Sequence, residues 1–330
     1  MSKKKIFGCS FPALIILSLV LLLVMVFGII TGPIGQSLGE KFPALSSLST
    51  LGPEWLKVEK PAPTLAPGVI TRIGGLPITN TMITAWITII ILVLVSFLAF
   101  RKPKIVPTGL QKVMEFIYGA LMDFCFSVAG EKNGRRFFPF VATIFVFVIT
   151  NAWLGLLPFY GDALWVIGEG GHHVPLLRAA NTDINVPLAL ALFSWISIET
   201  FGLRANGFLP YMKKFLNFRR IGSGITNLFK GKIKTALSDL IFGVIDVFVG
   251  LLEGVSEIIR IVSFTFRLFG NMTAGEVLIL VVAFLAPLVL GSVVYGMELF
   301  FGFLQALIFG GLTLVWMNMA IEKHGEEEHH

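Results

Sequence analysis

The polar residues with the clearest chemical meaning stand inside the apolar stretch Phe264–Leu278. Arg267, Asn271 and Glu276 interrupt this stretch. An arginine at the centre of a membrane helix costs about 2.5–3.5 kcal/mol on insertion-derived scales, and its guanidinium cannot avoid that cost by losing its proton. Such a permanent charge indicates a functional site, here one that acts on ions or protons. The alternative is a structural ion pair within a helix bundle.

Helical spacing places most polar residues of the last third of the chain on two stripes. The first stripe consists of Glu253, Arg260, Arg267 and Asn271, with spacings of seven, seven and four residues. Residues at these spacings share one helix face. Glu298 and Gln305, again seven residues apart, form the second stripe on the following helix. Two such stripes in an apolar hairpin can face each other or an aqueous crevice.

Glu276 does not belong to the first stripe. It lies nine residues after Arg267, roughly opposite on an ideal helix, so either a glycine distorts the helix or Glu276 serves a separate wet pocket. The apolar segment Leu240–Ala286 contains no proline. As one helix it would be about 70 Å long, whereas the hydrocarbon core of a bilayer is about 30 Å thick. The segment must therefore break, at Gly270 or Gly275, or tilt steeply.

Composition identifies an integral membrane protein. Of the 330 residues, 55% are hydrophobic and 14% are charged, and the mean hydropathy is +0.84. Soluble proteins carry about 25% charged residues. The net charge of +6 does not indicate nucleic-acid binding, because the basic residues lie between apolar segments, where membrane orientation explains them. Residue spacing predicts no metal site and no phosphate-binding loop, so we expect no cofactor and no catalytic site in this chain.

The predicted fold is all-α and multi-pass, with about four upright spans, a surface amphipathic helix and a long C-terminal helical hairpin. Hydropathy divides the chain into an N-terminal apolar segment (1–31), an external irregular segment rich in Gly and Pro (32–80) and a membrane domain (81–330), with the hairpin at about 240–321. The first segment follows three lysines. A retained span with its N-terminus inside is favoured over a cleaved signal peptide, which stays an alternative.

The other predicted elements follow from periodicity and charge. Residues 110–124 show helical spacing of apolar residues, typical of a helix on the inner membrane surface or of one packed on neighbouring spans. Thr108 and Gln111 form a capping-box pattern before it. The predicted spans around this helix are Thr81–Phe100, Phe137–Phe159 and Val186–Phe201. The loop that follows them is rich in Lys and Arg and is therefore predicted to be cytoplasmic.

The motif R-L-F-G-N-M-T-A-G-E at 267–276 resembles the signature of subunit a of the membrane sector of rotary F-type ATP synthases. Further similarity covers Leu252–Ser256, Leu304–Thr313 and Ala180–Val186, so that it spans most of the chain after about residue 108. The resemblance implies a stator subunit whose last two helices form a steeply tilted hairpin. In this family the hairpin clasps the rotating ring of c subunits, and two offset proton half-channels meet there.

The resemblance also implies residue roles. It assigns proton translocation to Arg267, Asn271, Glu276, Glu298, Gln305 and Glu253, with Arg178 and Asp183 at the outer mouth. Arg267 would face the ring carboxylates and act as the electrostatic gate. Asn271, Glu276 and Glu298 would serve the outer path, Gln305 would pack near Arg267, and Glu253 would lie towards the inner path. Some members have a histidine in place of Glu298, so two carboxylates can share a proton in the outer path here.

The implied partners are the c ring, the b-type peripheral stalk subunits, other ATP synthase subunits and the lipid bilayer. The implied location is a bacterial plasma membrane, with both termini cytoplasmic if the first segment is retained. Any nucleotide chemistry belongs to a partner, and the choice between H⁺ and Na⁺ rests largely on the ring. The competing interpretations are a self-contained ion or solute transporter with a charged hairpin, and a scaffold whose charges only pair helices. No internal repeat supports the transporter.

Overall fold

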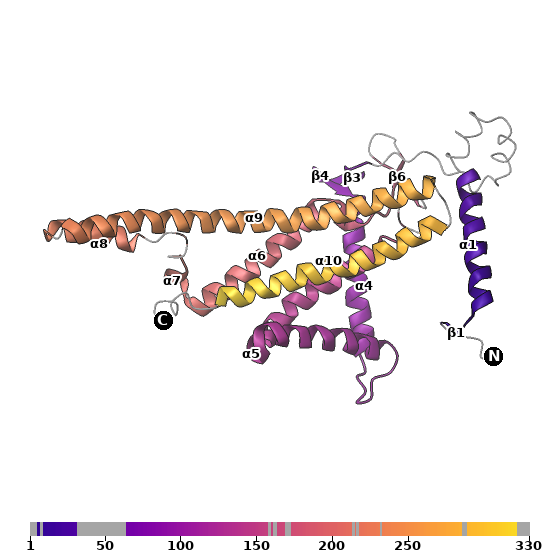
Figure 1. Cartoon of the computed structure of the whole chain (residues 1–330), viewed down its shortest axis with the longest axis horizontal. Helices are drawn as coiled ribbons and strands as arrows, with labels where there is room; N and C mark the ends of the chain where they lie inside the picture. The colour runs from indigo at the N-terminus through magenta and orange to yellow at the C-terminus, as the bar shows by residue number, and fades with distance from the viewer. Residues whose placement is uncertain are drawn as a thin grey trace.

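The computed structural model describes residues 5–6, 9–31, 64–157, 160, 164–168, 173–212, 215, 218–231, 233–285 and 289–321. Five helices of this part are long and apolar enough to cross a membrane: α4 (Asn80–Phe100), α5 (Leu110–Leu154), α6 (Asn185–Asn206), α9 (Ile233–Leu285) and α10 (Val289–Ile321). The all-α, multi-pass architecture is thereby confirmed (Figure 1). The shorter helices are η3 (Ala180–Thr182), α7 (Phe208–Met212) and α8 (Arg219–Phe229).

The described residues before α4 include one long helix and two small hairpins, one before this helix and one directly before α4. α1 (Phe11–Thr31) covers the predicted first apolar segment, and β1 (Lys5–Ile6) pairs with β2 (Cys9–Ser10) before it. Whether α1 is retained stays a prediction. Residues 32–63, most of the predicted external segment, lie outside the described residues. A third antiparallel pair, β5 (Trp165–Ile167) with β6 (His173–Pro175), follows α5.

The end of the external segment was expected to be irregular, but it forms regular structure. Residues Val69–Ile73 (β3) and Leu76–Thr79 (β4) form an antiparallel hairpin. The two residues between the strands, Gly74 and Gly75, have φ values of 58° and 86°. A two-residue hairpin turn needs such positive φ values, which glycine adopts at little cost, while the β-branched residues of β3 favour a strand. The proline-rich composition upstream masked this local signal.

α5 consists of two helices that meet at Gly130, whose φ of 71° is not helical. The first part corresponds to the predicted amphipathic helix and the second to the predicted span; Figure 1 shows the corner between them. The first part buries Cys125 and Ala129 against Leu314 and Met317 of α10. These contacts support the alternative in which this helix packs on a neighbouring span, and its position on the membrane surface stays a prediction.

The predicted capping box at the start of α5 is wrong. The N-cap residue is Gly109, which makes no side-chain cap. Gln111 instead pins the preceding loop: its Oε1 accepts from the Lys104 amide at 3.1 Å and its Nε2 donates to the Lys104 carbonyl at 3.0 Å. In this position the glutamine satisfies a backbone N–H and a backbone C=O of the loop at once, which is more favourable than a single bond at the helix N-terminus.

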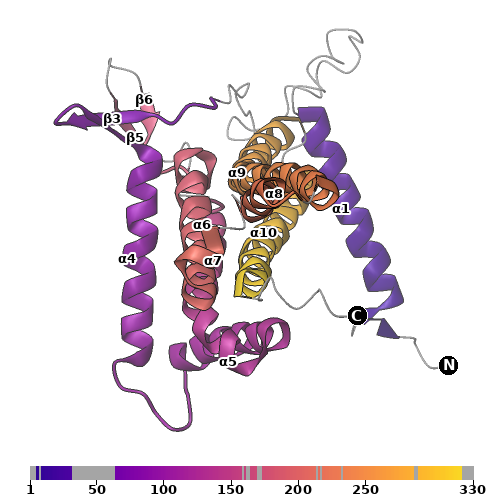
Figure 2. The same cartoon turned by 90° about the vertical axis from the view of Figure 1, so that its left-hand side faces the viewer.

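The C-terminal hairpin is formed by α9 and α10. α9 is one unbroken helix of 53 residues, so the proposed break at Gly270 or Gly275 does not occur. At 1.5 Å per residue it is about 80 Å long and can lie in a bilayer only if it is steeply inclined. Figure 1 shows both helices running along the long dimension of the molecule, across the direction of α4, and Figure 2 shows them side by side. The predicted tilted hairpin is confirmed, and α9 begins at Ile233 rather than about 240.

The core of the bundle lies where α9 and α10 meet α5 and α6. Phe264 and Leu268 of α9 pack with Phe309 of α10, and the rings of Phe264 and Phe309 are 4.8 Å apart. Ile144 and Val148 of α5 complete this cluster. The packing buries one side of α9, whereas the opposite side stays exposed at Ile259, Ser263, Phe266, Gly270 and Ala274.

Candidate functional site in the tilted hairpin

Arg267 lies at the edge of the exposed side of α9. Its Nη2 lies 3.5 Å from the Ser263 hydroxyl, and its guanidinium carbon is 5.8 Å from the Phe264 ring centroid. No carboxylate oxygen of a described residue lies within 4.0 Å of this guanidinium. The described part of the chain therefore does not supply the fixed ion pair that was the alternative explanation. A half-buried cation in an apolar hairpin calls for compensation from outside these residues.

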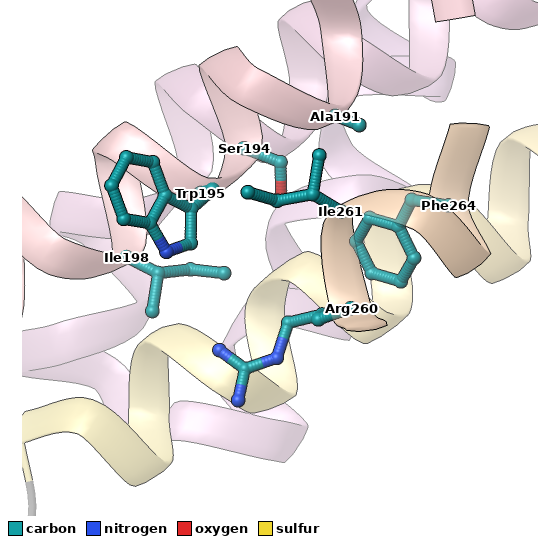
Figure 3. A pocket seen from close by; sticks show the side chains of 7 residues that line it. All are labelled: Ala191, Ser194, Trp195, Ile198, Arg260, Ile261 and Phe264. Atoms are coloured by element: carbon teal, nitrogen blue, oxygen red, sulfur yellow. The ribbon is translucent and has the colours of Figure 1, made fainter. Parts of the chain in front are cut away.

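Arg260, on the same predicted stripe, has a different environment. Its Nη1 donates to Glu257 Oε2 at 2.7 Å, and the two side chains are only 8% and 6% exposed. The guanidinium also lies 3.8 Å from the centroid of the Trp316 ring on α10, a favourable cation–π contact. Figure 3 shows Arg260 extending from α9 beside Trp195 and Ile198 of α6. Arg260 is thus neutralised within the chain and serves packing.

Glu276 belongs to a second polar site, on another side of α9. Arg178 binds its carboxylate with two nitrogens: Nε lies 3.0 Å from Oε1 and Nη2 lies 2.9 Å from Oε2. The same guanidinium donates to the carbonyls of Thr64 at 2.8 Å and Ala66 at 3.2 Å. Because α9 is unbroken, Glu276 lies on another side of the helix than Arg267, and the alternative in which a glycine distorts the helix is wrong; the separate wet pocket stays a prediction. The pair joins two predicted site residues that local spacing could not connect.

Buried polar side chains lie on the helices next to this second site. We name as the outer polar cluster the buried residues Asn80, Thr81, Thr84, Thr88, Asn151, Asn181, Thr182 and Asp183. They meet where η3 contacts α4, α5 and α9. Asp183 accepts from the Thr81 hydroxyl at 2.8 Å and from the Asn185 side-chain amide at 2.9 Å, and Asn151 Oδ1 accepts from the Ala180 backbone amide at 3.0 Å. This set was missed by sequence reasoning apart from Asp183.

The returning helix α10 brings Glu298 to the same region. Glu298 is buried, and its carboxylate packs directly on the Cα of Gly275, next to Glu276 in the chain. Gln305 is also buried, and its Nε2 has no hydrogen-bond partner among the described residues. The expected packing of Gln305 near Arg267 is not supported by a hydrogen bond in this part of the chain. Asn271 and Glu253 are both half-buried on α9.

Replacement of Gly275 by alanine is expected to displace the Glu298 carboxylate and to reduce the proton pumping that the sequence resemblance implies, with little loss of stability. A Cβ at this position would overlap both carboxylate oxygens of Glu298, and this flexible side chain must move. The matched control is Gly296→Ala, because a Cβ there meets no heavy atom within 4 Å. Both variants gain the helix propensity of alanine, up to about 1 kcal/mol, so their difference isolates the Glu298 contact. Pumping and thermal melting of the two variants are compared; equal pumping contradicts the expectation.

Sequence comparison with known proteins shows the family of this chain. The protein family described as "ATP synthase A chain" matches residues 82–318. The chain is 32% identical over 251 residues to ATP synthase subunit a of Gloeobacter violaceus, covering 76% of this chain and 86% of that protein. It is 31% identical over 246 residues to ATP synthase subunit a of Helicobacter hepaticus, covering 74% of this chain and 90% of the relative. This multi-pass membrane protein therefore belongs to the ATP synthase subunit a family.

Proposed function

We propose that the chain is the stator subunit that forms two proton half-channels against a rotating c ring, with Arg267 as the gate between them. The observation that carries this proposal is the environment of Arg267: a half-buried cation without an ion-pair partner in the described chain. It borders a face of α9 on which Ser263, Gly270 and Ala274 are small and exposed. Small residues let a neighbouring helix approach closely in a membrane, as a ring helix must.

The magnitudes fit a reversible switch. A ring carboxyl group that arrives protonated from lipid is neutral, so its burial is tolerable. Beside the Arg267 guanidinium its ionised form gains about 4 kcal/mol at about 4 Å with an effective dielectric constant near 20. This attraction favours release of the proton into the inner path. It does not lock the pair, because the membrane potential supplies about 2.3 kcal/mol per charge per 100 mV.

The two paths lie on different parts of the hairpin. Glu276, Asn271 and Glu298, with the outer polar cluster, would conduct on the outer side, and Glu253 would lie towards the inner side. The fixed charge of Arg267 stands between them in the sequence of α9 and repels a proton that crosses directly. The buried donor of Gln305 is suited to bind water or the ring in the assembled complex.

Neutral replacement of the two outer carboxylates tests the outer path. We expect Glu276→Gln and Glu298→Gln each to reduce pumping in part, and the double variant to reduce it severely, because one carboxylate can carry the proton when the other is lost. The measurement is the initial rate of ATP-driven acidification of inverted vesicles at equal complex content. Two mild, additive effects would argue against a common path.

The remaining assignments follow from the same proposal. The partners are the c ring, the b-type peripheral stalk and the other ATP synthase subunits. The membrane is a bacterial plasma membrane, with both termini on the cytoplasmic side if the first apolar segment is retained. The chain itself would bind no nucleotide and would carry no catalytic site. Its contribution to rotation is electrostatic, and ATP chemistry takes place in partner subunits.

A density map of the assembled complex tests the proposal directly. We expect the guanidinium of Arg267 to face a ring of helical hairpins, with ring carboxyl groups passing Ser263 and Gly270. A cysteine at Phe266, which is exposed on the same face, should form a disulfide with a cysteine placed next to the ring carboxylate. A map in which Arg267 points away from any ring, towards a fixed acid of its own chain, would falsify the proposal.

A further inference from the structure

An arm that the proposed proton paths do not use projects from the bundle. α8 folds back along the first turns of α9, and Figure 1 shows the two helices extending together beyond α6, α7 and α10. The contact is close: a Cβ on Gly224 would meet Leu240, and one on Gly243 would meet the backbone of Ile221. We name residues 219–231 and 233–246 the α8–α9 arm. Its tight seam indicates a built helical hairpin rather than a loop.

The arm satisfies its own acidic residues. Asp239 accepts hydrogen bonds from Ser223 at 3.0 Å and from Asn227 at 2.8 Å. Asp246 pairs with Arg220 at 3.4 Å, and Arg220 also stacks over the Phe242 ring at 5.9 Å. Both carboxylates are therefore engaged along the seam, so the charge that the described part of the arm leaves exposed beside its apolar side chains is basic.

The tip of the arm combines exposed apolar and cationic side chains. Leu228, Phe229 and Ile233 are 53%, 87% and 70% exposed. Lys230 and Lys234 lie among them, also exposed, and no described carboxylate is within 4.0 Å of either ammonium group. Apolar side chains beside lysines are typical of segments that sit at the lipid interface and contact anionic headgroups.

We propose that this tip binds anionic phospholipid headgroups of the inner leaflet and thereby anchors the start of α9. Charge selects the ligand: the two lysines complement a phosphate, while Phe229 and Leu228 enter the acyl boundary. The basic content of the loop between α6 and α9 assigns the tip to the cytoplasmic side by the positive-inside rule. The inference rests on the membrane orientation in the proposed function but not on Arg267 or the ion path.

The anchor has a mechanical use in that setting. A long, steeply inclined helix that meets a moving ring along its middle is pushed sideways by it. Tethering its first turns to the headgroup layer resists this push without adding a protein contact. Because Gly224 of α8 packs closely on Leu240 of α9, a tip held at the headgroups also holds the first turns of α9.

The test uses the complete complex that contains this chain, reconstituted in vesicles of phosphatidylcholine. A fluorophore is placed at Thr226→Cys on the exposed side of α8, in a Cys9→Ser, Cys125→Ala background, and phosphatidylglycerol with a headgroup quencher is titrated in. We expect saturable quenching. In Lys230→Gln, Lys234→Gln the apparent affinity should fall about 25-fold, about fivefold for each lysine near an anionic surface.

Two controls make the result specific. Lys230→Arg, Lys234→Arg keeps both charges and should keep the affinity, and Lys102→Gln removes an exposed lysine outside the arm and should leave the quenching unchanged. Quenching that is unsaturable, or unaltered by the double neutral variant, overturns the proposal. Absence of quenching because another subunit covers the tip also overturns the proposal. Cross-linking from the Thr226→Cys variant to that subunit would detect this case. Normal pumping by an Arg267→Ala variant would reject the proposed gate and leave this measurement intact.

Discussion

Replacement of Arg267 by alanine is expected to abolish ATP-driven proton pumping while the complex still assembles. The side chain is half-buried at the edge of an exposed face and makes no ion pair among the described residues. Its loss therefore leaves no described carboxylate without its partner. In the proposed function it does remove an attraction of about 4 kcal/mol for an ionised ring carboxylate, which corresponds to about a thousandfold in the proton-release equilibrium. It also removes the charge that blocks direct proton leakage. Pumping is measured in inverted vesicles at equal complex content.

Two further variants sharpen this experiment. Arg267→Lys should restore little, because a buried ammonium can lose its proton whereas a guanidinium does not. The matched control is the double variant Glu257→Gln, Arg260→Gln, which removes a neutralised pair from the same helix. It should keep pumping, since replacing both partners of a buried pair costs far less than removing one. Normal coupled pumping by Arg267→Ala rejects the gate.

The contrast between Arg260 and Arg267 shows how far sequence reasoning reaches. Seven-residue spacing placed both arginines on one face of a helix, and both do lie on α9. Spacing cannot show that Trp316, on another helix, lies over one guanidinium and not the other. The nearby Glu257 was a usable signal, because residues three apart are neighbours on a helix surface. Charge in a motif identifies candidates, and only tertiary contacts separate a neutralised arginine from an uncompensated one.

The spans themselves could be predicted because the bilayer leaves few solutions. Backbone groups in lipid must be satisfied within the segment, so long apolar stretches become helices of predictable length. Where water or loops compete, prediction was weaker: Gln111 bonds the backbone of Lys104 instead of capping a helix, and two glycines close a hairpin in a segment expected to be irregular. The choice between a broken and a tilted α9 required the family resemblance or the structure, since length alone allows both.

The pair formed by Arg178 and Glu276 is the contact that sequence reasoning was least able to find, because 98 residues separate the partners. Arg178 is expected to be essential for the stability of the outer site. Its guanidinium is 8% exposed and neutralises Glu276 while also binding the carbonyls of Thr64 and Ala66. Removing one partner of a buried pair costs about 3–5 kcal/mol. Since the Glu276 side chain is 31% exposed, solvent offsets part of this, and Arg178→Met should cost about 2–3 kcal/mol.

A double-mutant cycle separates this structural role from transport. Glu276→Gln in the Arg178→Met background removes the uncompensated carboxylate, so it should recover more than half of the lost stability, measured by thermal melting of the purified complex. Pumping should not rise above the partial level of Glu276→Gln alone, because Glu298 is then the remaining outer carboxylate. The control Arg135→Met removes an exposed arginine whose pair with Glu131 lies within one helix, and it should change melting little. If the two outer substitutions are additive in stability, the pair is uncoupled and Arg178 acts only through the carbonyls of Thr64 and Ala66. Recovery of stability with pumping still limited to the partial level of Glu276→Gln would mean that the Glu276 carboxylate both pairs with Arg178 and carries part of the proton flow.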